Sequence, residues 1–279
     1  MKERISLTLN KSILEQVDML IDSTKMRSRS HAIELLLSKA LNTKKIEHAL
    51  ILAGGKGTRL RPLTYEIPKV MIPLQGRPFL QHLIEMLKKH DITDILLSVG
   101  YLKEQIKEYF GNGSKFGVKI RYIEEEKPLG TAGCLKLAKS FLKSSFVMMN
   151  GDEFKEVDLH DMFSFHKKRG GLGTIGLKTT DTPENYGIAV MQGSRIMRFV
   201  EKPKTFVSNL FSAGIYILEP EIIDLIPEGY AMVETDLFPK LAEQGKLAGY
   251  PFEGRWYDLG TFERYEKAIK ELGNENAKD

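Results

Sequence analysis

The sequence has few of the residues that cross-link a chain or anchor it. Its 279 residues include one cysteine, Cys134, so an internal disulfide is excluded. The six histidines are scattered, and no Cys/His group has the spacing of a zinc site. No apolar run approaches the roughly eighteen residues that a membrane helix needs, and the first residues lack the apolar segment of a signal peptide. We therefore expect a soluble, cytoplasmic protein without membrane contact.

A large excess of charge is also absent, and the small excess is unevenly distributed. Lys and Arg number 41, and Asp and Glu number 37. The first 45 residues hold nine basic and five acidic residues, so the whole excess lies in that segment. This favours a small basic module, residues 1–43, joined to a charge-balanced body, residues 47–279. The length and the 42% hydrophobic content are sufficient for two domains.

The first module has the pattern of one strand followed by two helices. Residues 4–9 alternate polar and apolar side chains, which is the period of a half-buried strand. Residues 13–21 and 33–41 carry apolar side chains at helical spacing. About forty residues cannot bury enough apolar surface as a monomer, so we expect the module to pair with its own copy, strand against strand. The protein would then be a homodimer or a higher homo-oligomer.

This order of elements resembles a ribbon-helix-helix domain, the fold of many small repressors. The resemblance implies that the outward side chains of the ribbon contact base edges in the major groove of DNA. In this sequence those residues are Arg4, Ser6 and Thr8. A module that only dimerises the protein is the alternative, and both interpretations stay open.

The most informative stretch is residues 52–64, which follows an apolar, strand-like segment. Its glycines can take positive φ and bring main-chain N–H groups close to an anion, while nearby Arg and Lys side chains add positive charge. The residues concerned are Gly54, Gly55, Gly57, Arg59, Arg61 and Lys69. A P-loop is excluded because glycine follows Lys56, and a dinucleotide fingerprint is excluded because Leu60 stands where its third glycine belongs. We expect a nucleoside triphosphate here, with a plain glycine turn as the alternative.

Helix-like and strand-like segments alternate after this loop. Helical spacing covers residues 79–90, 103–110 and 131–142, and apolar strand-like runs cover 94–99, 118–123 and 145–149. The alternation predicts an α/β fold with a Rossmann-like, mostly parallel sheet, whose ligands bind at the carboxyl ends of the strands. Asp152 follows one such strand, and a carboxylate beside a triphosphate suggests Mg²⁺. The later strands are expected to form a second, less regular layer around an acceptor.

These motifs, in this order, resemble the sugar-1-phosphate nucleotidyltransferases over residues 46–272. The resemblance implies transfer of a nucleotidyl group from a nucleoside triphosphate to a sugar 1-phosphate, with release of pyrophosphate. The runs 59–64 and 130–133 look most like the mannose-1-phosphate guanylyltransferases. Thymidylyl or uridylyl transfer to glucose 1-phosphate is the close alternative. The alternative from another class is a ribbon-helix-helix transcriptional regulator with a nucleotide-sugar sensing domain.

The resemblance also implies roles for individual residues. Nucleotide contacts are expected from Leu52, Ala53, Gly54, Gly55, Gly57, Thr58, Arg59, Lys69 and Gly130. Sugar-phosphate contacts are expected from Tyr186, Gly187, Glu201, Lys202 and Ser212. The expected catalytic residues are Arg59, Lys69, Asp152, Lys202 and Asp258, with Asp152 and Asp258 as ligands of Mg²⁺. Ser212 departs from the family pattern, because many relatives have Asn there and a hydroxyl makes fewer hydrogen bonds than an amide.

Overall fold

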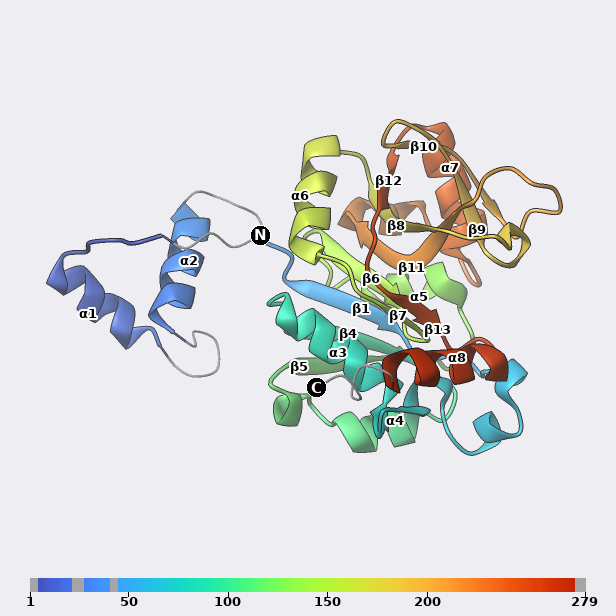
Figure 1. The fold of residues 1–279 in the computed structure, drawn as a ribbon, viewed down its shortest axis with the longest axis horizontal. Helices are drawn as coiled ribbons and strands as arrows, with labels where there is room; N and C mark the ends of the chain where they lie inside the picture. The colour runs from blue at the N-terminus through green and yellow to red at the C-terminus, as the bar shows by residue number, and fades with distance from the viewer. Residues whose placement is uncertain (1–4, 22–27, 41–44, 274–279) are drawn as a thin grey trace. The chain divides into compact units, whose positions relative to one another are not determined.

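The computed structural model describes residues 5–21, 28–40 and 45–273 (Figure 1). The chain divides into two compact units, Met1–Lys45 and Ile46–Asp279. None of the described helices combines the length and the apolar character needed to cross a lipid bilayer.

The first unit contains two short helices with little core between them. The helices are α1 (Lys11–Met19) and α2 (Arg29–Ala40). The Arg29 guanidinium donates two hydrogen bonds to the Asp18 carboxylate, at 2.6 and 2.7 Å, and so ties the end of α1 to the start of α2. Among the described side chains of this unit, the buried hydrophobic ones are Val17 and Ala32. So small a core indicates that much of the unit's apolar surface is left uncovered in the single chain.

The strand predicted for the first unit is not seen among its described residues. The described residues 5–9 form no strand, and Ile5, Leu7 and Leu9 are 66%, 55% and 37% exposed. A two-stranded ribbon needs a strand from a second copy, so the ribbon-helix-helix domain stays a prediction. Of the residues predicted to contact DNA, Ser6 and Thr8 are exposed, and Arg4 lies outside the described residues.

The second unit is built on one nine-stranded mixed sheet with helices on both faces (Figure 1). The strands, in their order across the sheet, are β5 (Lys119–Glu124), β4 (Asp94–Val99), β1 (His48–Leu52), β6 (Phe146–Asn150), β11 (Leu210–Leu218), β8 (Gly173–Thr179), β12 (Leu247–Pro251), β10 (Arg195–Glu201) and β9 (Gly187–Gln192). Two small sheets pair β2 (Pro73–Leu74) with β3 (Arg77–Pro78) and β7 (Glu153–Lys155) with β13 (Trp256–Asp258). The helices are α3 (Phe79–Lys89), α4 (Lys103–Phe110), α5 (Gly130–Ala138), α6 (Leu159–Arg169), α7 (Phe238–Glu243) and α8 (Phe262–Gly273).

The sheet is parallel throughout only in its first half, and in the second half β8 and β12 form a parallel pair among antiparallel neighbours. Strands β5, β4, β1 and β6 run parallel, as predicted. Strand β11 is antiparallel to both β6 and β8, and β9 and β10 form an antiparallel hairpin beside β12. The prediction of a mostly parallel sheet is therefore wrong for the second half. The predicted second layer is wrong too, because the later strands continue the same sheet. Strands β9 and β10 follow one another through a short turn, and strands joined in this way run antiparallel.

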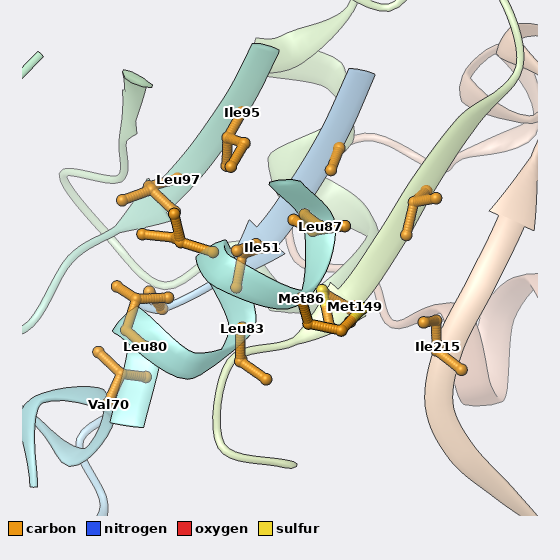
Figure 2. Packing of buried hydrophobic residues seen from close by; sticks show 14 of the residues in the cluster. Ile51, Val70, Leu80, Leu83, Met86, Leu87, Ile95, Leu97, Met149 and Ile215 are labelled. Carbon is orange, nitrogen blue, oxygen red and sulfur yellow. The ribbon is translucent and has the colours of Figure 1, made fainter. Parts of the chain in front are cut away.

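Strand β1 is buried on both faces because its side chains alternate between two apolar clusters. Ile51 belongs to the cluster on one face, and Leu50 belongs to the cluster on the other. Figure 2 shows Ile51 among Leu80, Leu83 and Leu87 of α3, in the same apolar cluster. The spacing of these leucines places them on one side of the helix, so α3 covers that face of the sheet.

The path of the chain through the parallel strands determines where a ligand can bind. From β5 the chain crosses over β4 and β1, by way of α5, to reach β6 on the far side of β1. The registers place Leu52, at the end of β1, beside Ser98 of β4 and Asn150 of β6. In open α/β sheets, ligands bind outside the carboxyl ends of the strands at such a crossover point.

Candidate active site

A cavity of about 870 Å³ lies at the carboxyl ends of β1, β4 and β6. Its wall combines the glycine loop, the ends of these strands, the start of α5 and a loop before α7. The lining residues are Leu52, Gly54, Gly55, Lys56, Lys69, Val70, Ser98, Gly100, Tyr101, Glu125, Glu126, Pro128, Gly130, Thr131, Asn150, Asp152, Tyr230 and Met232. The structure thus brings the predicted nucleotide residues Leu52, Gly54, Gly55, Lys69 and Gly130 together with Asp152.

The glycines of the loop act differently from one another. Gly57 alone of the three has a positive φ, at +59°, so the expected use of positive φ at Gly54 and Gly55 is wrong. Gly54 is needed for close packing instead, because a Cβ there would lie 3.2 Å from the Gly100 nitrogen. The Thr64 hydroxyl donates to the Gly57 carbonyl oxygen at 2.8 Å and holds the turn. The loop is therefore shaped by its own contacts at least as much as by a ligand.

The other predicted nucleotide residues lie outside the cavity wall. Ala53 is buried beneath the loop, and Thr58 and Arg59 are exposed. A Cβ added at Gly260 would lie 3.4 Å from Arg59 Nη2, so the Arg59 guanidinium reaches the turn that follows Asp258. Arg59 is thus placed next to the second predicted metal ligand rather than inside the cavity.

Lys69 and Asp152 form an ion pair in the cavity wall. Lys69 is buried, and its ammonium donates to the Asp152 carboxylate. Burial of Asp152 by itself raises the pKa of the carboxyl, but the charge and hydrogen bond of Lys69, with help from Lys155, outweigh it. The pKa of Asp152 is therefore lowered, and the side chain is a carboxylate at neutral pH. The pair presents one positive and one negative group to a ligand in the cavity.

Asp258 is brought to Asp152 by the pairing of β7 with β13. The register sets Asp258 opposite Glu153, and the Leu259 N–H donates to the Asp152 carbonyl oxygen at 2.9 Å. The Asp258 carboxylate is buried and accepts from Arg264 Nη1 at 2.9 Å. Two motifs that are far apart in the sequence therefore meet at one edge of the cavity.

The carboxylates of Asp152 and Asp258 are few for a metal site made of protein alone. In the described part of the chain, no group of three or more His, Cys, Asp and Glu side chains is arranged to hold a metal. Mg²⁺ commonly takes one or two carboxylates and completes its shell with water and substrate phosphates. Asp152 and Asp258 lie on neighbouring backbone segments, and two carboxylates are as many as an ion needs when it binds together with phosphate oxygens.

The predicted sugar-phosphate residues gather at the ends of β9, β10 and β11, beside the cavity rather than in its wall. Gly187 pairs with Glu201 across the hairpin, and the Lys202 N–H donates to the Tyr186 carbonyl oxygen at 2.9 Å. The Tyr186 ring lies 5.8 Å from the ring of Trp256, which is on the same strand as Asp258. This aromatic contact links the sugar-side residues to the predicted metal ligands.

Lys202 and Ser212 differ in how free their side chains are. Lys202 is 65% exposed at its side chain and lies 3.5 Å from the Glu201 carboxylate, so its ammonium is within reach of a ligand. The Ser212 hydroxyl lies 3.3 Å from the Tyr216 hydroxyl and donates to it. Ser212 therefore has less capacity to read a ligand than the resemblance implies.

The chain matches the family model "Nucleotidyl transferase" over residues 48–275. The chain belongs to this family. The resemblance to nucleotidyltransferases is thereby confirmed at the level of the family.

Individual members of the family show how similar the chain is to its relatives. It is 44% identical over 218 residues to mannose-1-phosphate guanyltransferase 2 of Candida glabrata, covering 76% of this chain and 60% of that protein. It is 38% identical over 218 residues to mannose-1-phosphate guanyltransferase beta-B of Xenopus laevis, covering 76% of this chain and 61% of that protein. The chain therefore spans about three fifths of the length of these curated relatives. Among solved structures, it is similar to HddC from Yersinia pseudotuberculosis complexed with GMP-PN, with a TM-score of 0.70 and 29% identity, covering 81% of this chain and all of that chain.

Several residues of this family member's cavity were missed by sequence reasoning. The buried Ser98 hydroxyl donates to Glu125 Oε1 at 2.6 Å, and Glu125 Oε2 accepts from the Leu129 N–H at 2.9 Å. Glu125 thus fixes the segment before α5 against the end of β4. Thr131 donates to the Glu234 carboxylate at 2.5 Å and ties α5 to the segment before α7. The sequence offered one signal for Ser98, which is a polar residue near the end of an apolar, strand-like run. Glu125 and Glu234 lie in segments with no motif.

A buried ion pair on β7 was also missed. Lys155 is fully buried and donates to the carbonyl oxygens of Gly214 at 2.8 Å and Asn150 at 3.3 Å. Its ammonium lies 3.9 Å from Glu153 Oε2. Burial lowers the pKa of Lys155 to about 8, and burial, with the charge of Asp152, raises the pKa of Glu153 to about 7. In the sequence, the polar segment Glu153–Lys155 is typical of a solvent-exposed strand. The burial of the Lys155 ammonium is therefore visible only in the packed structure.

Proposed function

We propose that this chain transfers a guanylyl group from GTP to mannose 1-phosphate, giving a nucleotide-sugar and pyrophosphate. The observation that carries the proposal is the Lys69–Asp152 pair in the wall of the cavity at the crossover point, with Asp258 beside it. The cavity volume of about 870 Å³ lies in the range of ligand pockets, which is about 300–1,000 Å³. The names of the relatives and the GMP-PN complex of HddC support guanine and mannose as the substrate groups.

The reaction requires two anions to meet, and the residues present are suited to that task. A phosphate oxygen of the sugar 1-phosphate attacks the α-phosphorus of the triphosphate in line, and the leaving group is pyrophosphate. The nucleophile is already an anion, so no general base is needed. The barrier comes from positioning and charge repulsion, which fixed charged groups reduce.

Each charged residue then has a defined part. Lys69 binds triphosphate oxygens in the cavity wall, and Arg59 approaches the same phosphates from the Asp258 side. Lys202 binds the phosphate of the acceptor and orients it. Asp152 and Asp258 would hold Mg²⁺, which neutralises phosphate charge when it is bound.

Two alternatives remain to be separated from this proposal. Thymidylyl or uridylyl transfer to glucose 1-phosphate uses the same chemistry with a different base and sugar. A regulator that only senses a nucleotide-sugar would bind the ligands without turnover. The intact set of charged residues in and beside the cavity favours an enzyme.

Steady-state pyrophosphate release with a panel of substrates tests the proposal. The full chain is assayed with GTP, dTTP, UTP and ATP against mannose 1-phosphate and glucose 1-phosphate, with Mg²⁺. We expect the highest kcat/KM for GTP with mannose 1-phosphate, and no release when the sugar phosphate is omitted. A higher kcat/KM for dTTP or UTP with glucose 1-phosphate would contradict the substrate assignment. Tight binding without turnover of any pair would contradict the enzyme itself.

We also propose that the first unit joins two copies of the chain. Its apolar residues Ile5 and Leu7 are exposed by 66% and 55%, and a second copy of the same segment would cover them as an antiparallel ribbon. Size-exclusion chromatography with light scattering is expected to give twice the chain mass of 31.7 kDa. The change Leu7→Asp is expected to give the single-chain mass. A wild-type mass of 31.7 kDa would contradict dimerisation.

DNA binding by this dimer is proposed on the basic excess of the first 45 residues and the exposed Ser6 and Thr8. Such binding depends on the release of counterions from DNA, so it should weaken steeply as salt is raised. Fluorescence anisotropy of the full chain with duplex DNA over a salt series measures this. Leu7→Asp is expected to abolish binding together with dimerisation. Lack of binding at low salt by a proven dimer would leave dimerisation as the role of the unit.

A further inference from the structure

The buried Glu153–Lys155 pair is not used by the chemistry proposed above. Taking a carboxylate and an ammonium out of water costs several kcal/mol for each ion, and a well-packed apolar pair of similar volume is often just as stable. Lys155 is 0% exposed at its side chain and Glu153 is 17% exposed. A pair that is costly to bury, next to a proposed substrate site, calls for a functional explanation.

The Glu153 carboxylate is held in place from two sides. Asn150 Nδ2 donates to Glu153 Oε1 at 2.9 Å, and Trp256 Nε1 donates to Oε2 at 3.3 Å. The Lys155 ammonium lies on the buried side and is itself fixed by two backbone carbonyl oxygens. Each carboxylate oxygen has more than one acceptor position, so both keep the capacity to accept a further hydrogen bond.

Strand β11 leaves room for this carboxylate through an irregularity at Gly214. The pairing of β11 with β8 shifts register between Ser212 and Tyr216, and Gly214 within that interval has φ +61°. A Cβ at Gly214 would overlap Glu153 Oε2, so glycine is needed for the close approach. The carboxylate therefore lies against the segment that carries Ser212, among the proposed sugar-phosphate residues.

Two other polar groups at this place also have partners. The Ser212 hydroxyl donates to Tyr216, and the Glu201 carboxylate lies 3.5 Å from the Lys202 ammonium. The Glu153 side chain is 17% exposed, and it has no expected place among the metal ligands. Its remaining acceptor positions suit the hydroxyl groups of a sugar.

We infer that Glu153 is a specificity-determining residue, whose carboxylate accepts a hydrogen bond from a ring hydroxyl of the acceptor sugar. The inference rests on the proposed function, because it names what reads the sugar in that same site. Lys155 balances the charge of this carboxylate from beneath. A site built to bind a hydroxyl leaves its polar group unpaired when the substrate lacks that hydroxyl, and so rejects the analogue strongly.

The test is a cycle of changes in the enzyme and in the substrate. Wild type, Glu153→Gln and Glu153→Asp are assayed as full chains with GTP and with mannose 1-phosphate or its 2-, 3-, 4- and 6-deoxy analogues. The Gln variant keeps the shape of the Glu153 side chain without its charge. The Asp variant keeps the charge but is one methylene shorter, so the carboxylate lies farther from the sugar. We expect kcat/KM for mannose 1-phosphate to fall about 10- to 100-fold in both variants, mainly through the KM of the sugar, with the KM of GTP within about twofold.

The decisive result is one deoxy analogue for which the loss of kcat/KM seen in wild type is absent in the variants. Loss of the hydroxyl that Glu153 binds is expected to cost wild type about 100-fold and each variant less than about threefold. Additive effects for every analogue would overturn the inference while the proposed function stands. Lack of turnover of any sugar 1-phosphate by wild type would overturn both.

Glu156→Gln provides the matched control. Glu156 follows the same strand. Its carboxylate accepts two hydrogen bonds from the Arg255 guanidinium, at 2.5 and 2.8 Å, and has no expected place among the sugar-side residues. Its kcat/KM is expected to stay within about twofold of wild type for every analogue. A penalty pattern in Glu156→Gln equal to that in Glu153→Gln would show a general effect of charge and contradict the assignment.

Discussion

The contact between Gly130 and Ala231 offers a direct test of how the cavity wall is built. Gly130 begins α5 with φ +78°, and a Cβ there would overlap the Ala231 carbonyl oxygen and lie 2.9 Å from its carbon. Gly229 has nearly the same φ, +81°, but a Cβ there would meet nothing within 4 Å. The changes Gly130→Ala and Gly229→Ala therefore share the backbone strain, and only the first adds a steric overlap.

The size of the difference follows from these two contributions. An alanine held in the left-handed region costs about 1–2 kcal/mol, and both variants carry this cost. Overlap in a packed region adds about 1–3 kcal/mol at Gly130 alone. For a domain of this size, 1 kcal/mol lowers Tm by about 2–4 °C. We expect Tm to fall by about 10 °C in Gly130→Ala and about 4 °C in Gly229→Ala.

Thermal unfolding followed by circular dichroism measures both shifts, and pyrophosphate release measures the effect on substrates. The backbone of Ala231 also accepts from the N–H groups of Ala132 and Gly133, at 2.9 and 3.2 Å, so the overlap disturbs the start of α5. We expect the KM of GTP to rise in Gly130→Ala and to stay near wild type in Gly229→Ala. Equal Tm shifts in the two variants would refute the argument from close packing.

Three further predictions test individual charged groups. Asp152→Asn should lower kcat by about 100- to 1,000-fold, because the carboxylate acts on the phosphates, and should also lower Tm, because the buried Lys69 ammonium loses its paired charge; turnover near wild type in Mg²⁺ would argue against its role. Lys202→Ala should raise the KM of the sugar phosphate about 10-fold with the KM of GTP unchanged; the reverse split would place Lys202 on the nucleotide. The hydrogen bond from His166 holds the pKa of Glu219 at about 2, below its usual 4.5, so this carboxylate stabilises the fold above pH 4.5 and ceases to do so as the pH falls towards 2. Urea unfolding should show wild type about 1–2 kcal/mol more stable than Glu219→Gln at pH 6, after allowance for partial exposure, with the gap closing near pH 2; a gap that does not depend on pH would contradict this.

The parallel half of the fold and its site could be predicted because the signals there are local. Apolar runs such as the one ending at Leu52 are buried on both faces, and a polar residue a few positions after such a run, such as Asp152, lies at the carboxyl end of the strand. The place of the glycine loop could be predicted in the same way, because the loop comes directly after the strand that ends at Leu52. In the first unit, the Ser28 hydroxyl oxygen accepts from the His31 N–H at 3.2 Å and caps the start of α2.

The antiparallel half and the buried charges could not be predicted in this way. Strand β11 lies between β6 and β8, an arrangement set by packing between distant segments. Lysine is rarely buried, so nothing in the sequence around Lys155 indicates a fully buried ammonium. Gly130 was expected to contact the nucleotide. In the structure, the atom that a Cβ at Gly130 would overlap is the Ala231 carbonyl oxygen.

The most direct test of the central claim follows the phosphate oxygens of the acceptor. The full chain is incubated with GTP, Mg²⁺ and mannose 1-phosphate that carries oxygen-18 in its nonbridging phosphate positions, and the products are analysed by mass spectrometry and phosphorus NMR. Attack of the sugar phosphate on the α-phosphorus predicts label in the nucleotide-sugar, including the oxygen between its two phosphorus atoms, and none in pyrophosphate. Label in pyrophosphate or in free phosphate would contradict the account.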